Sequence, residues 1–164
     1  ADFIHESRRK FLRRSQLAIQ SSTNGAHSGV TQIPKDVTVL LLDSIGELAS
    51  LYKCADGVFV GGSLVPSGGH NILEPAAFGK IPVFGPSMEN FSEIAARFVS
   101  AGAAVQVESP EDAGVAWIEF FREPERMRKM GESARALVED SRGATDRAVA
   151  VISGFVNEHG ALRR

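Results

Sequence analysis

The sequence predicts an α/β fold, a Rossmann-like doubly wound parallel sheet with helices on its faces. Two apolar runs rich in branched residues, VTVLLLDS at 37–44 and DGVFVGGS at 56–63, are typical of strands buried on both faces of a parallel sheet. Segments with helical spacing separate such runs, and strand and helix units recur along the chain. This alternation favours right-handed βαβ crossovers.

Each element is expected in the following order. Phe3, Phe11 and Leu12 predict a short helix in the basic opening, followed by a strand at 15–21 and a Gly- and Ser-rich loop at 22–29. After the strand at 37–44, the spacing predicts helices over 46–55, 72–79 and 91–102, and strands over 56–63, 81–86 and 103–109. Three closing helices are expected over 110–123, 124–140 and 144–159. Pro110 and Pro124 stand early enough to begin helices.

Composition limits the class of protein. With 164 residues, 43% hydrophobic and 23% charged, the chain is expected to form one folded domain over 1–164. A net charge of -2 removes the general electrostatic case for nucleic-acid or anionic-membrane binding. The single Cys54 and the lack of a long apolar run predict a cytosolic protein without a membrane span. The missing initiator Met suggests a piece of a longer chain.

A glycine-rich segment, GGSLVPSGGHNILEPAAFGK at 61–80, directly follows a predicted buried strand. Gly61 and Gly62 allow close backbone approach, and Gly68 and Gly69 permit positive φ. Together with the N–H groups of the following helix, such a loop can hold a phosphate without net positive charge. The alternative is a tight turn from strand to helix.

For two side chains of this segment, the sequence allows two different roles each. Glu74 either caps the following helix, alone or in a capping box with Asn71, or accepts both hydroxyls of a ribose. His70 either donates to a phosphate or carboxylate or bonds to its loop neighbours.

Several established motifs are absent from the sequence. It contains no G-x-G-x-x-G, no G-x-x-x-x-G-K-[ST] and no G-x-S-x-G. It has no D-x-D pair, and its four histidines are far apart, so no metal site is expected.

The run FVGGSLVPSGGHNILEPAAFGKIPVFGPSMENF at 59–91 resembles the nucleotide-donor half of the Kdo (3-deoxy-D-manno-octulosonic acid) transferases of lipopolysaccharide synthesis. That family has the two-domain GT-B fold. The flanking runs LRRSQ, IGELASLYKCAD and PERMRKMGESARALVEDSRGA agree with the family in the right order. The resemblance covers nearly the whole chain and implies the C-terminal half of a GT-B fold.

The resemblance also implies a site for CMP-Kdo, the activated sugar donor. Because the sequence has no D-x-D pair and no clustered ligands, donor binding is expected to need no metal or other cofactor. It places Ile45, Gly46 and Glu47 near the nucleotide; Gly62, Ser63, Gly69 and His70 near the phosphate and sugar carboxylate; and Asn71 and Glu74 near the ribose. The chain departs from the family in two places. Leu42, Asp43 and Ser44 stand where the family has Gly-Asp-Thr, and Ser87 stands where it often has His.

The function that the resemblance implies is donor binding in an inverting glycosyltransferase. Such an enzyme transfers Kdo from CMP-Kdo to a lipid A precursor at the cytoplasmic side of the inner membrane. The catalytic base and the acceptor site would come from an N-terminal half that this chain lacks, so the piece alone would be inactive. The alternatives are a GT-B domain for a UDP-sugar and a non-catalytic nucleotide-binding module.

Overall fold

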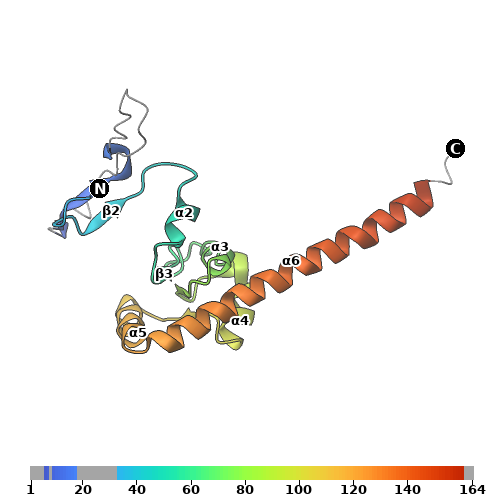
Figure 1. Cartoon of the computed structure of the whole chain (residues 1–164). Helices are drawn as coiled ribbons and strands as arrows, with labels where there is room; N and C mark the ends of the chain where they lie inside the picture. Colours follow the sequence, from blue (N-terminus) through green and yellow to red (C-terminus); the bar gives the residue numbers. More distant parts are fainter. Residues whose placement is uncertain (1–5, 8, 18–32, 161–164) are drawn as a thin grey trace, which may run out of the picture. The chain divides into compact units, whose positions relative to one another are not determined.

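The computed structural model describes residues 6–7, 9–17 and 33–160 (Figure 1). The chain divides into two compact units, residues 1–51 and 52–164, and each is described by itself. The expectation of a single domain over 1–164 stays a prediction.

The first unit contains a pair of parallel strands, β1 (Phe11–Arg13) and β2 (Val39–Leu41), with Leu12 opposite Leu40. A single 3-10 turn, η1 (Arg14–Gln16), follows β1 directly. Helix α2 (Leu48–Tyr52) begins at the end of this unit.

The predicted positions of the first helix and strand are wrong where they can be compared. Residues 11–13 form a strand rather than part of a helix, and the expected strand at 15–21 begins instead as η1. The reason is a long-range contact. The Asp43 carboxylate accepts hydrogen bonds from the backbone N–H and the hydroxyl of Ser15, and these bonds hold the chain in a turn. The rest of that strand and the loop at 22–29 lie outside the described residues.

The second unit is built on three parallel strands in the order β3 (Val58–Phe59), β4 (Pro82–Phe84) and β5 (Val105–Gln106). Its helices are α3 (Leu73–Ala77), η2 (Glu89–Phe91), α4 (Ser92–Ser100), α5 (Pro110–Arg122) and α6 (Pro124–Gly160). Parallel strands alternate with helices, so the predicted α/β, Rossmann-like class is confirmed.

Helices cover both faces of this sheet. Neighbouring residues of β4 point to opposite faces, so Phe84 packs in one apolar cluster and Val83 in another. The first cluster lies under α3, α4 and α6 and includes Ile72, Ala76, Phe98, Ala134 and Val138. The second lies under α5 and includes Ile81, Val107, Ala113 and Phe120. The strand expected at 81–86 is present as β4, and its residues are buried on both faces.

The expectation that the runs at 37–44 and 56–63 are buried on both faces is wrong. Val39–Leu41 of β2 are only half-buried and Phe59 of β3 is 40% exposed, because both strands lie at the edge of their sheets.

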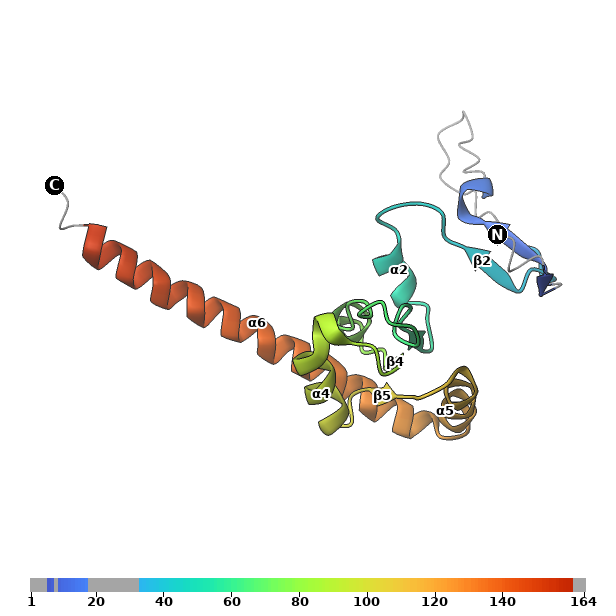
Figure 2. The same ribbon diagram turned by 180° about the vertical axis from the view of Figure 1, so that it is seen from behind.

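The closing segment differs from the expectation. Instead of two helices over 124–140 and 144–159, α6 runs without interruption from Pro124 to Gly160 and extends beyond α3, α4 and α5 (Figures 1 and 2). No proline stands between 140 and 144, and one Gly inside a helix costs only about 1 kcal/mol. Nowhere in the described ranges does a helix have both the length and the apolar character needed to cross a membrane.

Two glycines of α6 provide a test of this packing. A Cβ on Gly131 would overlap the carbonyl oxygen of Gly79, whereas a Cβ on Gly154 would meet open space. We expect Gly131→Ala to lower the free energy of unfolding by about 1–3 kcal/mol. Gly154→Ala should raise it by about 0.5–1 kcal/mol, because alanine favours the helix. Denaturant unfolding measures both, and a stabilised Gly131→Ala variant would contradict the close contact between α6 and the turn after α3.

Candidate functional site

The glycine loop, residues 61–71, follows β3 and lies at the carboxyl-terminal edge of the sheet. Ligands of open α/β sheets bind at this edge. Gly62, Gly68 and Gly69 have φ values of 69°, 80° and 68°, which favour glycine over every other residue. The expected positive φ at Gly68 and Gly69 is therefore confirmed.

A second segment, which we call the clasp (residues 87–90), follows β4 and makes hydrogen bonds with the glycine loop. The Gly68 N–H donates to the Ser87 hydroxyl oxygen at 3.2 Å, and the Asn90 N–H donates to the Gly68 carbonyl at 3.3 Å. A Cβ on Gly68 would overlap the Asn90 side chain, and one on Gly69 would overlap Met88. The positive φ values favour glycine at both positions, and a larger residue would also have to displace the Asn90 or Met88 side chain.

Ser63 ties the two strand ends together. Its side chain is 0% exposed, and its hydroxyl donates to the Val60 carbonyl at 2.6 Å and accepts from the Gly85 N–H at 2.8 Å. Its own carbonyl accepts from the Ser87 N–H at 2.9 Å. The hydroxyl has only one hydrogen, so the structure gives it a structural role. A direct bond from this hydroxyl to a phosphate would require its bond to Val60 to break.

His70 lies on the exposed side of the loop. A Cβ on Gly62 would stand 3.6 Å from the Nε2 atom of His70, so the imidazole lies next to the Gly62 backbone. The N–H groups of Gly61, Gly62 and His70 find no protein acceptor among the described residues. These three N–H groups and the imidazole are therefore candidate donors to an anion.

Asn71 and Glu74 do not form the capping box that was one alternative. The side-chain oxygen Oδ1 of Asn71 accepts from the Leu73 N–H at 3.0 Å, and the Asn71 side-chain amide donates to Glu74 Oε1 only at 3.4 Å. Glu74 makes no cap and is exposed, so its carboxylate is accessible to a ligand. Helix α3 has five residues, and its dipole therefore adds little to anion binding.

Tyr52 is buried beside this carboxylate. Burial raises the pKa of the Tyr52 phenol, and the nearby charge of Glu74 raises the same pKa further. The Tyr52 ring packs against Phe78, with 6.0 Å between the ring centroids. The phenol therefore stays neutral, and its ring packs against the residue that directly follows α3.

The other three predicted site residues belong to the first unit. Ile45 is fully exposed, and Gly46 has a φ of 88° with open space around it. The Glu47 carboxylate accepts from Arg14 Nη2 at 2.8 Å and from the Ser44 hydroxyl. The bond from Ser44 and then the contacts with Arg14 lower the pKa of Glu47. These contacts, like the clasp, were missed by the sequence reasoning.

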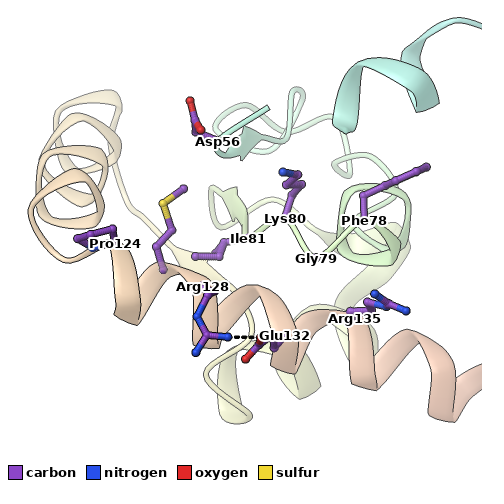
Figure 3. Close-up of a pocket in the computed structure, with 10 residues that line it drawn as sticks. Asp56, Phe78, Gly79, Lys80, Ile81, Pro124, Arg128, Glu132 and Arg135 are labelled. Carbon is purple, nitrogen blue, oxygen red and sulfur yellow. Dashed lines mark hydrogen bonds and ion pairs between the residues drawn. The ribbon is translucent and has the colours of Figure 1, made fainter. Parts of the chain in front are cut away.

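A cavity of about 320 Å³ lies elsewhere in the second unit (Figure 3). Asp56 precedes β3, and Lys80 and Ile81 precede β4, so this cavity lies at the amino-terminal edge, opposite the glycine loop. Arg128, on its rim, is paired with Glu125 and Glu132. None of the predicted site residues lines it.

Metal-ligand clusters are also absent from the parts of the chain that the structure describes, which contain no group of three or more His, Cys, Asp or Glu side chains able to hold an ion.

The role of Ser63 can be tested by Ser63→Ala. Loss of the hydroxyl leaves the buried Val60 carbonyl and Gly85 N–H without partners, so we expect a loss of about 2–3 kcal/mol in the free energy of unfolding. Ser133→Ala is the control, because the Ser133 hydroxyl donates to the Lys129 carbonyl of its own helix and this hydrogen bond is exposed. The free energy of unfolding of this variant should stay within about 0.5 kcal/mol of the parent's. Equal stabilities of the two variants would contradict the structural role.

Comparisons with known proteins show which families this chain resembles. The 3-deoxy-D-manno-octulosonic acid transferase of Haemophilus influenzae is 34% identical over 162 residues, which are 97% of this chain and 34% of that protein. The transferase of the same name from Bordetella pertussis is 34% identical over 120 residues, 73% of this chain and 28% of that protein. The chain therefore spans about a third of the length of these curated relatives.

A solved structure is also similar. The C-terminal CMP-Kdo binding domain of WaaA from Acinetobacter baumannii matches with a TM-score of 0.71 and 29% sequence identity, over 84% of this chain and 65% of that one. The family model of the glycosyl transferases group 1 matches residues 10–137, which is most of the chain. This protein is therefore a member of the group 1 glycosyl transferases and a homologue of the Kdo transferases.

Proposed function

We propose that this chain is the donor-binding part of an inverting glycosyltransferase that transfers Kdo from CMP-Kdo to a lipid A precursor. The observation that carries the proposal is the glycine loop at the carboxyl-terminal edge of a parallel sheet, where the N–H groups of Gly61, Gly62 and His70 have no acceptor among the described residues. The similarity to a domain described as CMP-Kdo binding supports the choice of donor.

In this proposal the loop binds the phosphate and stabilises the leaving group. An acceptor hydroxyl gives its proton to the catalytic base and attacks the anomeric carbon of Kdo. The bond from that carbon to the phosphate oxygen breaks, and its electron pair leaves with CMP, on which negative charge grows. Backbone N–H groups that are already oriented stabilise such charge without reorganising. His70 can add a further donor, and the exposed carboxylate of Glu74, beside Asn71, can accept the ribose hydroxyls.

The remaining predicted residues have supporting roles. Ser63 and Gly69 shape the loop. Ile45 is exposed in the first unit, and the Glu47 carboxylate accepts from Arg14 in the same unit. We further propose that the acceptor site and the catalytic base belong to another part of the enzyme, and that the enzyme works at the cytoplasmic face of the inner membrane.

We also propose that donor binding needs no divalent metal. Charge on the phosphate would be met by N–H groups and His70. Calorimetric titration with CMP should therefore give the same affinity in EDTA and in excess magnesium. Binding that is lost in EDTA and restored by magnesium would contradict this part of the proposal.

Glu74 provides the test of the nucleotide site. Because Glu74 is exposed and makes no cap, we expect Glu74→Gln to melt close to the parent. Its affinity for CMP should fall about tenfold, equivalent to ~1.4 kcal/mol, because the neutral amide weakens both ribose contacts. Calorimetry and thermal unfolding measure the two effects.

The matched control is Glu93→Gln, which changes an exposed glutamate in the first turn of α4 and should leave CMP affinity unchanged. A Glu74→Gln variant that melts lower yet binds CMP like the parent would show that Glu74 serves the fold. Tighter binding of UMP or UDP than of CMP would favour a UDP-sugar as donor.

A further inference from the structure

Ser87 is the first residue of the clasp and makes hydrogen bonds with three other residues. Its N–H donates to the Ser63 carbonyl at 2.9 Å, its hydroxyl oxygen accepts from the Gly68 N–H at 3.2 Å, and its hydroxyl hydrogen goes to Glu89 Oε2 at 2.7 Å. The residue is only 8% exposed, and Gly68 is buried. One small side chain thus connects the end of β4 to the glycine loop.

The direction of these bonds determines whether the Ser87 oxygen can accept from the Gly68 N–H. A hydroxyl has one hydrogen, and when the Glu89 carboxylate takes it, the lone pairs of the Ser87 oxygen remain for the Gly68 N–H. The bond from Ser87 also lowers the pKa of Glu89, so the carboxylate stays charged and keeps its preference for the hydroxyl hydrogen. Without Glu89, the hydroxyl could turn its hydrogen toward the loop and lose the bond to Gly68.

We propose that Ser87 and Glu89 are positioning residues for the glycine loop: Glu89 orients the Ser87 hydroxyl, and Ser87 fixes Gly68 so that the loop is already in its phosphate-binding conformation. This inference rests on the proposed function. Neither side chain needs to touch the ligand. Their effect on binding comes from the loop, because a loop that is ordered beforehand loses less conformational entropy when the phosphate binds.

The structure provides a closely matched control. Ser109 begins α5, accepts the Asp112 N–H at 3.1 Å and donates to Asp112 Oδ2 at 2.7 Å. Ser109 therefore bonds, like Ser87, to one backbone N–H and one carboxylate, but far along the chain from the glycine loop. Ser87→Ala and Ser109→Ala remove the same kinds of bonds.

The test measures CMP affinity by calorimetry and amide hydrogen exchange of Gly68 by NMR. We expect Ser87→Ala to weaken CMP binding by about three- to tenfold and to speed exchange at Gly68, because its amide loses a buried acceptor. Ser109→Ala should change neither, even if it melts lower. Ser87→Thr, which keeps the hydroxyl, should retain most of the affinity.

A double-mutant cycle distinguishes an effect of Glu89 through the orientation of the Ser87 hydroxyl from a direct effect of the Glu89 charge on the ligand. If Glu89 acts through Ser87, Glu89→Gln weakens CMP binding in the parent and has no effect in the Ser87→Ala background. If its charge acts on the ligand directly, the variant tightens binding equally in both backgrounds, and the proposed role of Glu89 is wrong. Because Glu89 is exposed, this variant tests the inference even if Ser87→Ala fails to fold.

The outcomes also separate this inference from the proposed function. Parent-like CMP binding and parent-like Gly68 exchange in Ser87→Ala would overturn the role of Ser87 while the nucleotide site stands. Absence of CMP binding by the parent would count against the proposed function, and the exchange at Gly68 would still show whether Ser87 holds the loop.

Discussion

The hydrogen bonds of the buried Ser63 hydroxyl are the constraint on which the rest of the site depends. They join the carboxyl end of β3 to that of β4, through the Val60 carbonyl and the Gly85 N–H. The chain after β4 must then pass close to the glycine loop, where a Cβ on Gly85 would overlap the Ser63 carbonyl. The clasp follows from this approach, and its Asn90 and Met88 side chains fill the space beside Gly68 and Gly69.

The electrostatics of the second unit show how an anion can be bound by a chain with a net charge of -2. At the amino-terminal edge, Arg128 is largely neutralised by Glu125 and Glu132, and Arg135 is paired with Glu139. At the carboxyl-terminal edge, donors come from the backbone instead. Because such N–H groups carry no net charge and are held by the fold, they favour a phosphate through geometry and local dipoles.

The sequence predicted the parts that depend on local pattern. The apolar run around Val83 and the glycines at 68 and 69 were placed correctly, because burial and positive φ leave direct signals. The first helix and strand were predicted at the wrong positions, because the Asp43 carboxylate accepts a hydrogen bond from Ser15, which lies 28 residues away in the sequence. The clasp was missed for the same reason: Gly68 and Ser87 are 19 residues apart, and Ser87 appeared only as a departure from a family pattern.

The central claim is that the nucleotide binds at the carboxyl-terminal edge of the sheet. Backbone amide shifts during a CMP titration of the chain test it most directly. The account predicts that the largest shifts fall within residues 61–74. Shifts concentrated at Lys80, Ile81 and Arg128, around the cavity at the opposite edge, with an unperturbed glycine loop, would contradict it.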